Sequence, residues 1–398
     1  MDSTSVHWHG FIQPHNAGHD GVPGITQCPI PPGGTFTYKI RATRYGPTWY
    51  HSHFTLQYGQ GALGPLMIHG PTVENWDIDL GQVLLTDYYR GSIYELWFQE
   101  RTAPPLASDN GLINGQNMFN GGGTFSEFKF TPGKRHRLTI VNTSVDAHFK
   151  FSIDGHNFTV QGADFIPIHP YEQNVLNINI GKISTLLDGA LISGQRYDII
   201  IEANLDVDNY WMRAFPASGC SAVNNSDWIR AIVRYEGSDD SLPTSTNWTI
   251  PDQTCEDEEG LVPWVARDVG GLAYGDQANI SIIKQNYEKF TMGGTSLQID
   301  WDDPTLLLAE KADPSYPGSY NVLEVNGTDD TVSLHDLIGA DTFCSGYTLS
   351  FNLLRLLRYP ILSTCTVTIF SNSQRVQACS MKAFSTVQTL STRFVEMS

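Results

Sequence analysis

Two pairs of histidines, each with one residue between its members, are the groups in this chain best suited to chemistry: His7-Trp8-His9 and His51-Ser52-His53. Residues i and i+2 of a β-strand point to the same face, about 6 to 7 Å apart, so each pair presents two imidazoles to one side. Two such strands side by side would bring four imidazoles together. Because neither pair includes a carboxylate or a thiolate, the set suits copper or zinc rather than magnesium or calcium.

The alternative is that these side chains are ordinary core or surface histidines, and spacing alone leaves that alternative open. One such pair among 12 histidines in 398 residues is unremarkable, whereas two pairs in one short block, both beside aromatic residues, favour a metal site. The other histidines stand singly. We interpret His15 and His19 as solvated loop residues, and five more as structural: His69, His136, His148, His156 and His169.

Short runs of β-type sequence must position the two pairs. Alternation with period two predicts strands over residues 36–42, 136–142, 149–153 and 197–203, and segments rich in Pro, Gly and Asn predict the turns between them. No amphipathic helix of ten or more residues is predicted in the first 330 residues. The expected fold class is therefore all-β, made of sandwiches or barrels.

The length predicts two or three domains. Gly70-Pro71 and the acidic segment at 251–263 suggest boundaries, which divide the chain into residues 1–72, 73–260, 261–330 and 331–398. The first unit is short for a sandwich of about 100 residues, so we expect its N-terminal strands to be missing. We interpret residues 261–330 as the start of a third domain.

Two segments differ from their surroundings. Residues 182–194 separate two strand-like runs, and we interpret them as a retained intron or a misplaced exon boundary; a tolerated surface-loop insertion is the alternative. The tail, 331–398, has no Gly after Gly346, no Asp after Asp341 and no Trp at all. We expect this tail to be foreign to the fold and poorly ordered.

Charge and hydropathy exclude two classes of partner. The formal net charge of −18 argues against binding to nucleic acid, because phosphates would repel the chain. No run of about 18 uncharged apolar residues predicts a membrane-spanning helix, and residues 1–6 do not resemble a signal peptide.

Other features are typical of secreted proteins. Six Asn-x-Ser/Thr acceptor sites occur, at Asn142, Asn157, Asn224, Asn247, Asn279 and Asn326. The six cysteines show no C-x-x-C spacing, which argues against a zinc ribbon or a redox dithiol. We predict a disulfide between Cys220 and Cys255.

Longer stretches around the histidine pairs resemble a known family. In the first block the matching stretches are 5–13, 20–34, 48–54 and 57–61, and in the second they are 109–115, 131–138, 141–144 and 194–198. From about residue 3 to about residue 326 the chain resembles the multicopper oxidases. The sequences of these motifs are most similar to those of the ascomycete-type laccases of filamentous fungi.

This resemblance implies three cupredoxin-like Greek-key β-sandwiches, the first and third incomplete here. It also implies a secreted, monomeric copper oxidoreductase that takes single electrons from phenolic or aromatic-amine substrates at a type 1 copper and reduces O2 to water at a trinuclear cluster. His7 would ligate the type 2 copper, and His9, His51 and His53 the type 3 pair. Cys28 resembles a family cysteine that is disulfide-bonded near the true C-terminus, and we expect that partner to be missing here.

The chain also departs from the family. The family's H-P-x-H-L-H-G and H-C-H segments are absent, His335 is the sole histidine after His169, and no histidine adjoins Cys344, Cys365 or Cys379. The type 1 ligands and half of the trinuclear ligands are therefore missing, so we expect the chain as written to be inactive. The alternatives are a non-catalytic copper-binding β-sandwich protein and a relative that binds no metal.

Overall fold

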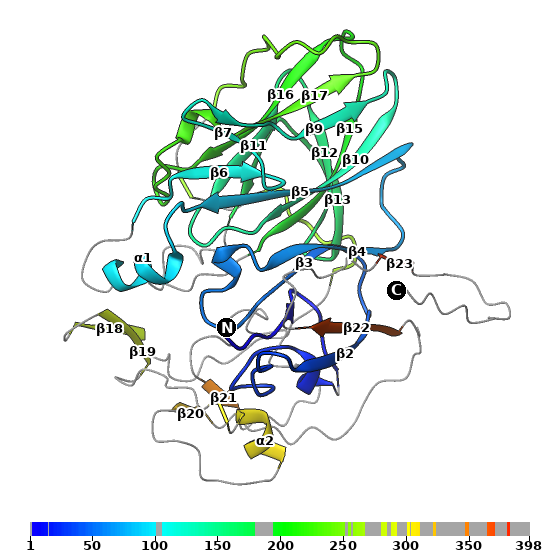
Figure 1. The fold of residues 1–398 in the computed structure, drawn as a ribbon. Helices are drawn as coiled ribbons and strands as arrows, with labels where there is room; N and C mark the ends of the chain where they lie inside the picture. Colours follow the sequence, from blue (N-terminus) through cyan, green and yellow to red (C-terminus); the bar gives the residue numbers. More distant parts are fainter. Residues whose placement is uncertain are drawn as a thin grey trace, which may run out of the picture.

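The computed structural model describes two β-rich bodies that follow one another along the chain (Figure 1). The described residues are 2–14, 16–100, 106–179, 194–250, 254–255, 258–266, 301–302, 304–310 and six strands from β18 to β23. Strands dominate these ranges, and the two α-helices among them are short, α1 (Ile93–Glu100) and α2 (Thr305–Glu310). The predicted all-β fold class is confirmed.

The second body is a sandwich of two sheets. One sheet has the order β13-β12-β15-β10-β5-β6, and the other has the order β14-β11-β16-β17-β9. Their bounds are β5 (Ile78–Tyr88), β6 (Asn110–Ile113), β9 (Glu127–Phe130), β10 (Arg135–Asn142), β11 (Phe149–Ile153), β12 (Phe158–Ala163), β13 (Ile166–Gln173), β14 (Val175–Ile178), β15 (Arg196–Glu202), β16 (Asn209–Pro216) and β17 (Arg230–Tyr235). A short hairpin, β7 (Met118–Phe119) with β8 (Gly122–Gly123), lies outside both sheets.

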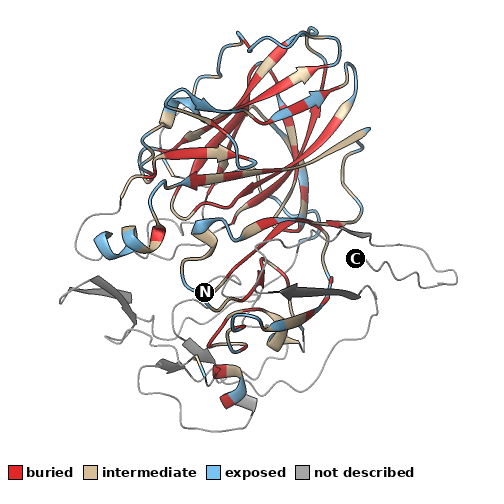
Figure 2. Cartoon of the chain, viewed as in Figure 1, coloured by how far each residue is buried: buried red, intermediate tan, exposed pale blue. Residues whose placement is uncertain are grey.

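Aromatic and branched side chains from the inner faces of both sheets form one core, and much of the ribbon of these sheets has the colour of buried residues in Figure 2. Phe149, Phe151 and Tyr197 are fully buried in it. Apolar burial of this kind contributes about 25 cal/mol per Å², so the core is the main term that stabilises the sandwich. The predicted strands at 136–142, 149–153 and 197–203 are confirmed by β10, β11 and β15, within one residue at each end.

The first body carries both histidine pairs. One sheet has the order β1-β3-β4-β23, and β2 pairs with β22 beside it. The bounds are β1 (His7–Trp8), β2 (Thr35–Arg41), β3 (Gly46–His51), β4 (Leu63–His69), β22 (Thr364–Phe370) and β23 (Ser380–Lys382). The predicted strand at 36–42 is confirmed by β2. A second, smaller core lies here, with Trp8, Tyr38 and Ile68 at its centre.

Strands β22 and β23 come from the tail that we expected to be foreign to the fold. Strand β22 pairs antiparallel with β2, and β23 pairs parallel with β4. The sequence did not predict these pairings. The remaining described strands beyond residue 270 are β18 (Ile280–Lys284), β19 (Glu288–Met292), β20 (Asn321–Leu323) and β21 (Tyr347–Leu349). Other predictions for the tail, and those for residues 182–193, lie outside the described residues.

The predicted disulfide joins Cys220 to Cys255, 35 residues apart in the chain. It ties the turn after β16 to the segment that leaves the sandwich. A cross-link over that many residues is worth about 3 to 4 kcal/mol, because it removes loop-closure entropy from the unfolded chain. We therefore expect the double variant Cys220→Ala/Cys255→Ala to lose about that much free energy of unfolding, measured by urea titration. An unchanged midpoint and slope would contradict this role.

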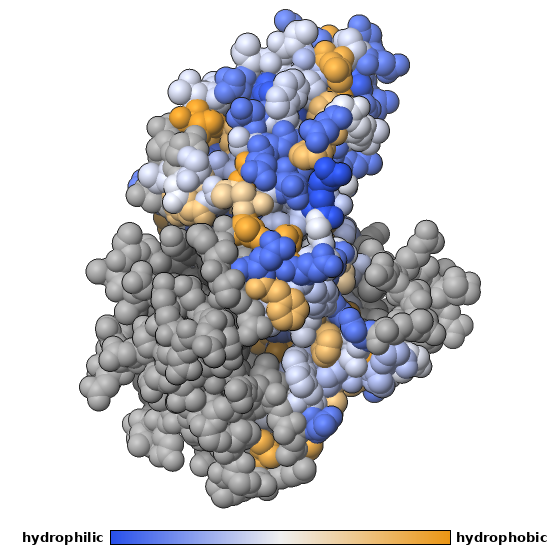
Figure 3. All heavy atoms as spheres, turned by 60° about the vertical axis from the view of Figure 1, so that its left-hand side comes forward, coloured by the Kyte–Doolittle hydropathy of each residue, from blue (hydrophilic) through white to orange (hydrophobic). Residues whose placement is uncertain are grey.

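Burial corrects one of the sequence-based inferences. Asn142, the first acceptor site, is fully buried, and its amide donates to the carbonyls of Ala147 and Ile178 at 2.8 and 3.1 Å. The folded chain therefore cannot be glycosylated at Asn142. Asn157, Asn224 and Asn247 are exposed, and Figure 3 shows a largely hydrophilic surface over the second body.

Candidate metal centre

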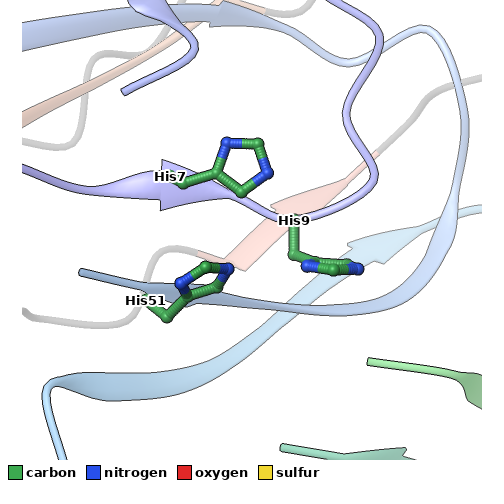
Figure 4. Close-up of side chains that lie close together, drawn as sticks. All are labelled: His7, His9 and His51. Carbon is green, nitrogen blue, oxygen red and sulfur yellow. The ribbon is translucent and has the colours of Figure 1, made fainter. Parts of the chain in front are cut away.

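Strand pairing brings the two histidine pairs together, as the sequence predicts. Strands β1 and β3 are antiparallel, with His7 opposite His51. The chain continues alongside beyond β1, since the His9 amide donates to the Trp49 carbonyl at 3.0 Å. The three rings of His7, His9 and His51 gather on one side of the two strands (Figure 4).

The four rings form a compact cluster. One ring nitrogen from each of His7, His9 and His51 lies within 4.8 Å of the other two. The ring centroids are 5.9 Å apart in the first pair and 5.8 Å apart in the second, close to the spacing expected for neighbours two residues apart on a strand. The His53 ring lies 5.5 Å from the ring of His7, so it borders the same space.

Hydrogen bonds to backbone carbonyls fix two of the rings. His7 Nδ1 lies 2.8 Å from the Asp20 carbonyl, and His51 Nδ1 lies 3.1 Å from the Ser52 carbonyl. A carbonyl oxygen can only accept, so Nδ1 carries the proton in each ring. The lone pair of Nε2 is then available to a metal, and the ring orientation is set before the metal arrives.

Gly21 allows the loop after Asp20 to approach His7. Its φ is +86°, and a Cβ at this position would lie 1.8 Å from the Val6 carbonyl oxygen. No other residue could occupy this place without moving β1.

Gln57 ties the two histidine-bearing segments to each other. Its Nε2 donates to the Ser3 carbonyl at 2.7 Å, and its Oε1 accepts from the Thr4 hydroxyl at 2.8 Å and from the Ser52 hydroxyl at 2.7 Å. One side chain therefore connects the approach to β1 with the residue between His51 and His53.

Burial keeps the central rings neutral. His9 is 3 % exposed and His51 is 8 % exposed. Burial lowers the pKa of both imidazoles well below the usual value. The Arg196 charge lowers the pKa of His9 further, and the neighbouring His7 ring lowers that of His51. Neutral imidazole is the form that binds metal, so these rings need lose no proton to do so near neutral pH.

Three contributors were missed at the sequence level. Trp49 stacks on the rings of His51 and His9, with centroids 4.3 and 5.1 Å apart. Alternation with period two would have found it, because residues 49 and 51 share a face. Asp20 and Arg196 act from other parts of the chain, and local spacing carries no signal for them.

Two of the isolated histidines, His136 and His156, have the structural role that we predict for them. His136 stacks on Phe130, and its Nε2 accepts the Thr131 amide at 3.0 Å. His156 hydrogen-bonds to the Tyr235 hydroxyl at 2.7 Å. His19 is only half-buried, but it accepts the Lys39 amide instead of being purely solvated. His15 lies outside the described residues.

The donor set fits copper. It consists of the imidazoles of His7, His9 and His51, which converge with no carboxylate in the group, and this suits copper or zinc and not a hard cation. A second group of ligand-type residues, around His148, includes Cys220 and Cys255, whose thiols are consumed by the disulfide.

Comparison with known proteins shows the family to which the chain belongs. Family models described as multicopper oxidase match residues 1–73 and 79–188. Laccase-3 of Botryotinia fuckeliana is 39% identical over 337 residues, which cover 81% of this chain and 71% of the relative. The chain belongs to the multicopper oxidase family.

Further similarities support the same family membership. Laccase-2 of Botryotinia fuckeliana is 42% identical over 340 residues, covering 82% of this chain and 56% of that protein. The crystal structure of the laccase from Botrytis aclada matches with a TM-score of 0.75 and 42% identity, covering 81% of this chain and 60% of that one. Fet3p, a multicopper oxidase, shares the fold with a TM-score of 0.65 at 23% identity. The cupredoxin-like fold class is thus confirmed, and the chain spans 56% of the length of Laccase-1 and of Laccase-2 of Botryotinia fuckeliana.

Proposed function

We propose that the chain binds copper through His7, His9, His51 and His53, with His7 at the type 2 position and the other three at the type 3 pair. The observation that supports this assignment is the cluster of three buried imidazoles whose nitrogens lie within 4.8 Å of one another. The cluster lies in the segment matched by the first multicopper oxidase model.

Within the site, each residue has a physical task. The Asp20 and Ser52 carbonyls hold the proton on Nδ1 of His7 and His51, and Trp49 closes one side against water. Copper, when bound, would supply one-electron chemistry and a place for O2 to be reduced. The chain's own residues orient the ligands, keep His9 and His51 neutral and exclude solvent.

The reaction that this site would serve is the oxidation of phenols or aromatic amines, one electron at a time, with O2 reduced to water. The laccases among the relatives support this substrate class. The chain as written carries no cysteine with a neighbouring histidine after residue 330, and type 1 blue copper needs such a ligand set. We therefore propose that this chain alone does not turn over.

A non-catalytic copper-binding β-sandwich protein is the second candidate function. The same missing Cys–His neighbours favour it, because the chain would hold copper with no site for electrons to enter. Secretion and a monomeric state go with either function. The exposed acceptor sites Asn157, Asn224 and Asn247 support secretion, and no helix in the described part of the chain is long and apolar enough to span a membrane.

Copper loading followed by oxygen uptake tests both functions. The full chain is loaded with Cu(I) under argon, freed of excess metal and reoxidised in air. We expect retained copper, no intense blue thiolate absorption, and no O2 consumption with a methoxyphenol above that of a quadruple His→Ala variant. Blue colour with O2 uptake would contradict the proposed inactivity, and failure to retain copper would contradict the metal site itself.

A further inference from the structure

The side chain of Arg196 lies buried at the start of β15, where the second sandwich meets the histidine cluster. Its Nη1 donates to the Gly194 carbonyl at 2.9 Å and lies 3.2 Å from Asp164 Oδ1. Its guanidinium lies over the Phe165 ring, 5.1 Å from the centroid. All three contacts are to residues of the second body, although the Phe165 ring also packs into the core of the first body, 5.9 Å from the Phe11 ring.

The backbone around Arg196 is fixed as well. The Arg196 amide donates to Asp164 Oδ1 at 3.0 Å, and the Asp164 amide donates to the Arg196 carbonyl at 3.0 Å. Asp164 therefore anchors both the main chain and the side chain of Arg196. A guanidinium with several such contacts has little freedom to move, unlike that of an exposed surface arginine.

This fixed guanidinium lies close to the turn that follows His9. A Cβ on Gly10 would lie 2.5 Å from Arg196 Nη2, and the φ of Gly10 is +73°, which favours glycine. On the other side of the turn, the Thr48 hydroxyl donates to the His9 carbonyl. The main chain of His9 and Gly10 is thus held between Thr48 and Arg196.

Gly194 reaches the cluster directly. A Cβ there would lie 2.8 Å from His9 Nε2 and 2.6 Å from Trp49 Nε1, and the φ of Gly194 is +93°. The second body therefore approaches His9 in two places: Gly194 lies next to the His9 ring, and Arg196 lies next to Gly10 in the turn that follows. Gly194 is also the last residue of the segment 182–194 that the sequence marks as irregular.

We propose that Gly194 and Arg196 form a second-sandwich wall of the histidine cluster, and that Arg196 is a positioning residue that holds His9, through Gly10, at the place where it can share a metal with His7 and His51. This inference rests on the proposed copper function. It makes the metal site depend on both bodies, although all four candidate ligands lie in the first.

The direction in which copper affinity changes when Arg196 is removed distinguishes a positioning role from a purely electrostatic one. A buried positive charge beside a copper site repels the metal, so an arginine that acted only through its charge would weaken binding, and its removal would tighten it. A positioning arginine has the opposite effect, because its removal lets His9 drift and weakens binding. Loss of an outer residue that orients a ligand typically costs about 10- to 100-fold in metal affinity.

The test is copper affinity, measured with a competing chelator on the folded full-length chain, for wild type, Arg196→Met and Arg196→Lys. We expect binding at least about 10-fold weaker in Arg196→Met and an intermediate loss in Arg196→Lys, which keeps the charge but not the fork. Arg135→Met is the control, because Arg135 lies on β10 in a partly exposed ion pair with Glu74. It should bind copper as wild type does.

Four outcomes must be distinguished. A purely structural arginine would lower the urea midpoint of Arg196→Met and leave the copper affinity of the folded variant unchanged, which overturns the proposal, as would tighter binding. If Arg196→Met does not fold, Arg196→Lys decides by the same comparison. Absence of copper binding by wild type would refute the proposed function instead, so the two failures are distinguishable.

Discussion

Replacing His51 by alanine is expected to weaken copper binding by more than about 100-fold, beyond the range seen for residues that only orient a ligand. His51 is central to the cluster: its ring lies 5.3 Å from that of His7, 5.7 Å from that of His9 and 5.8 Å from that of His53. Its removal takes a donor from the middle of the site and leaves Trp49 without its closest ring partner. Chelator competition with Cu(I) measures the loss.

His169→Ala is the matched control for this experiment. His169 is an exposed histidine of the second sandwich whose ring packs on Trp264, with centroids 4.7 Å apart. Its loss should leave copper affinity unchanged. Equal affinities for His51→Ala and His169→Ala would mean that copper binds elsewhere on the chain.

Replacing Arg213 by methionine is expected to lower the free energy of unfolding by about 3 to 5 kcal/mol, the usual effect of removing one partner of a buried ion pair. Arg213 Nε and Nη2 each donate to a carboxylate oxygen of Asp154 at 2.7 Å, and both side chains are buried. The variant leaves the Asp154 carboxylate with the Ser245 hydroxyl, which donates at 2.8 Å, but without its counter-charge. Urea unfolding followed by tryptophan fluorescence gives the value.

An exposed ion pair of the same sandwich provides the comparison. Lys129 and Glu236 lie 3.4 Å apart with side chains 72% and 43% exposed. Lys129→Met should change stability by no more than about 1 kcal/mol, because water screens the pair. If Arg213→Met proved as mild as Lys129→Met, the buried pair would not be what ties β16 to the turn after β11.

Local patterning predicted the strands and the gathering of the histidine rings well, because both depend on period two. Alternation places His7 with His9 and His51 with His53, and the structure brings these rings to one side. The same rule locates β10 and β11 within one residue. What it cannot give is the pairing partner: β10 lies parallel to β5 and antiparallel to β15, and that choice depends on the packing of the whole sandwich.

The remaining parts of the site come from contacts between distant segments. Asp20 reaches His7 because Gly21 has φ +86°, and Arg196 reaches Gly10 across 186 residues of chain. Neither contact leaves a periodic mark in the sequence. Asn142 shows the reverse case: its acceptor motif is a local pattern, but the sandwich buries the side chain.

X-ray absorption spectroscopy of the copper-loaded chain is the most direct test of the assignment of copper to the histidine cluster, because it reports which atoms bind the metal. With one equivalent of Cu(I), we expect a first shell of nitrogen alone, with the outer-shell scattering typical of imidazole, and the loss of this pattern in the quadruple variant at His7, His9, His51 and His53. A sulfur shell, from Cys28 or any other thiol, would contradict the assignment of copper to the histidine cluster.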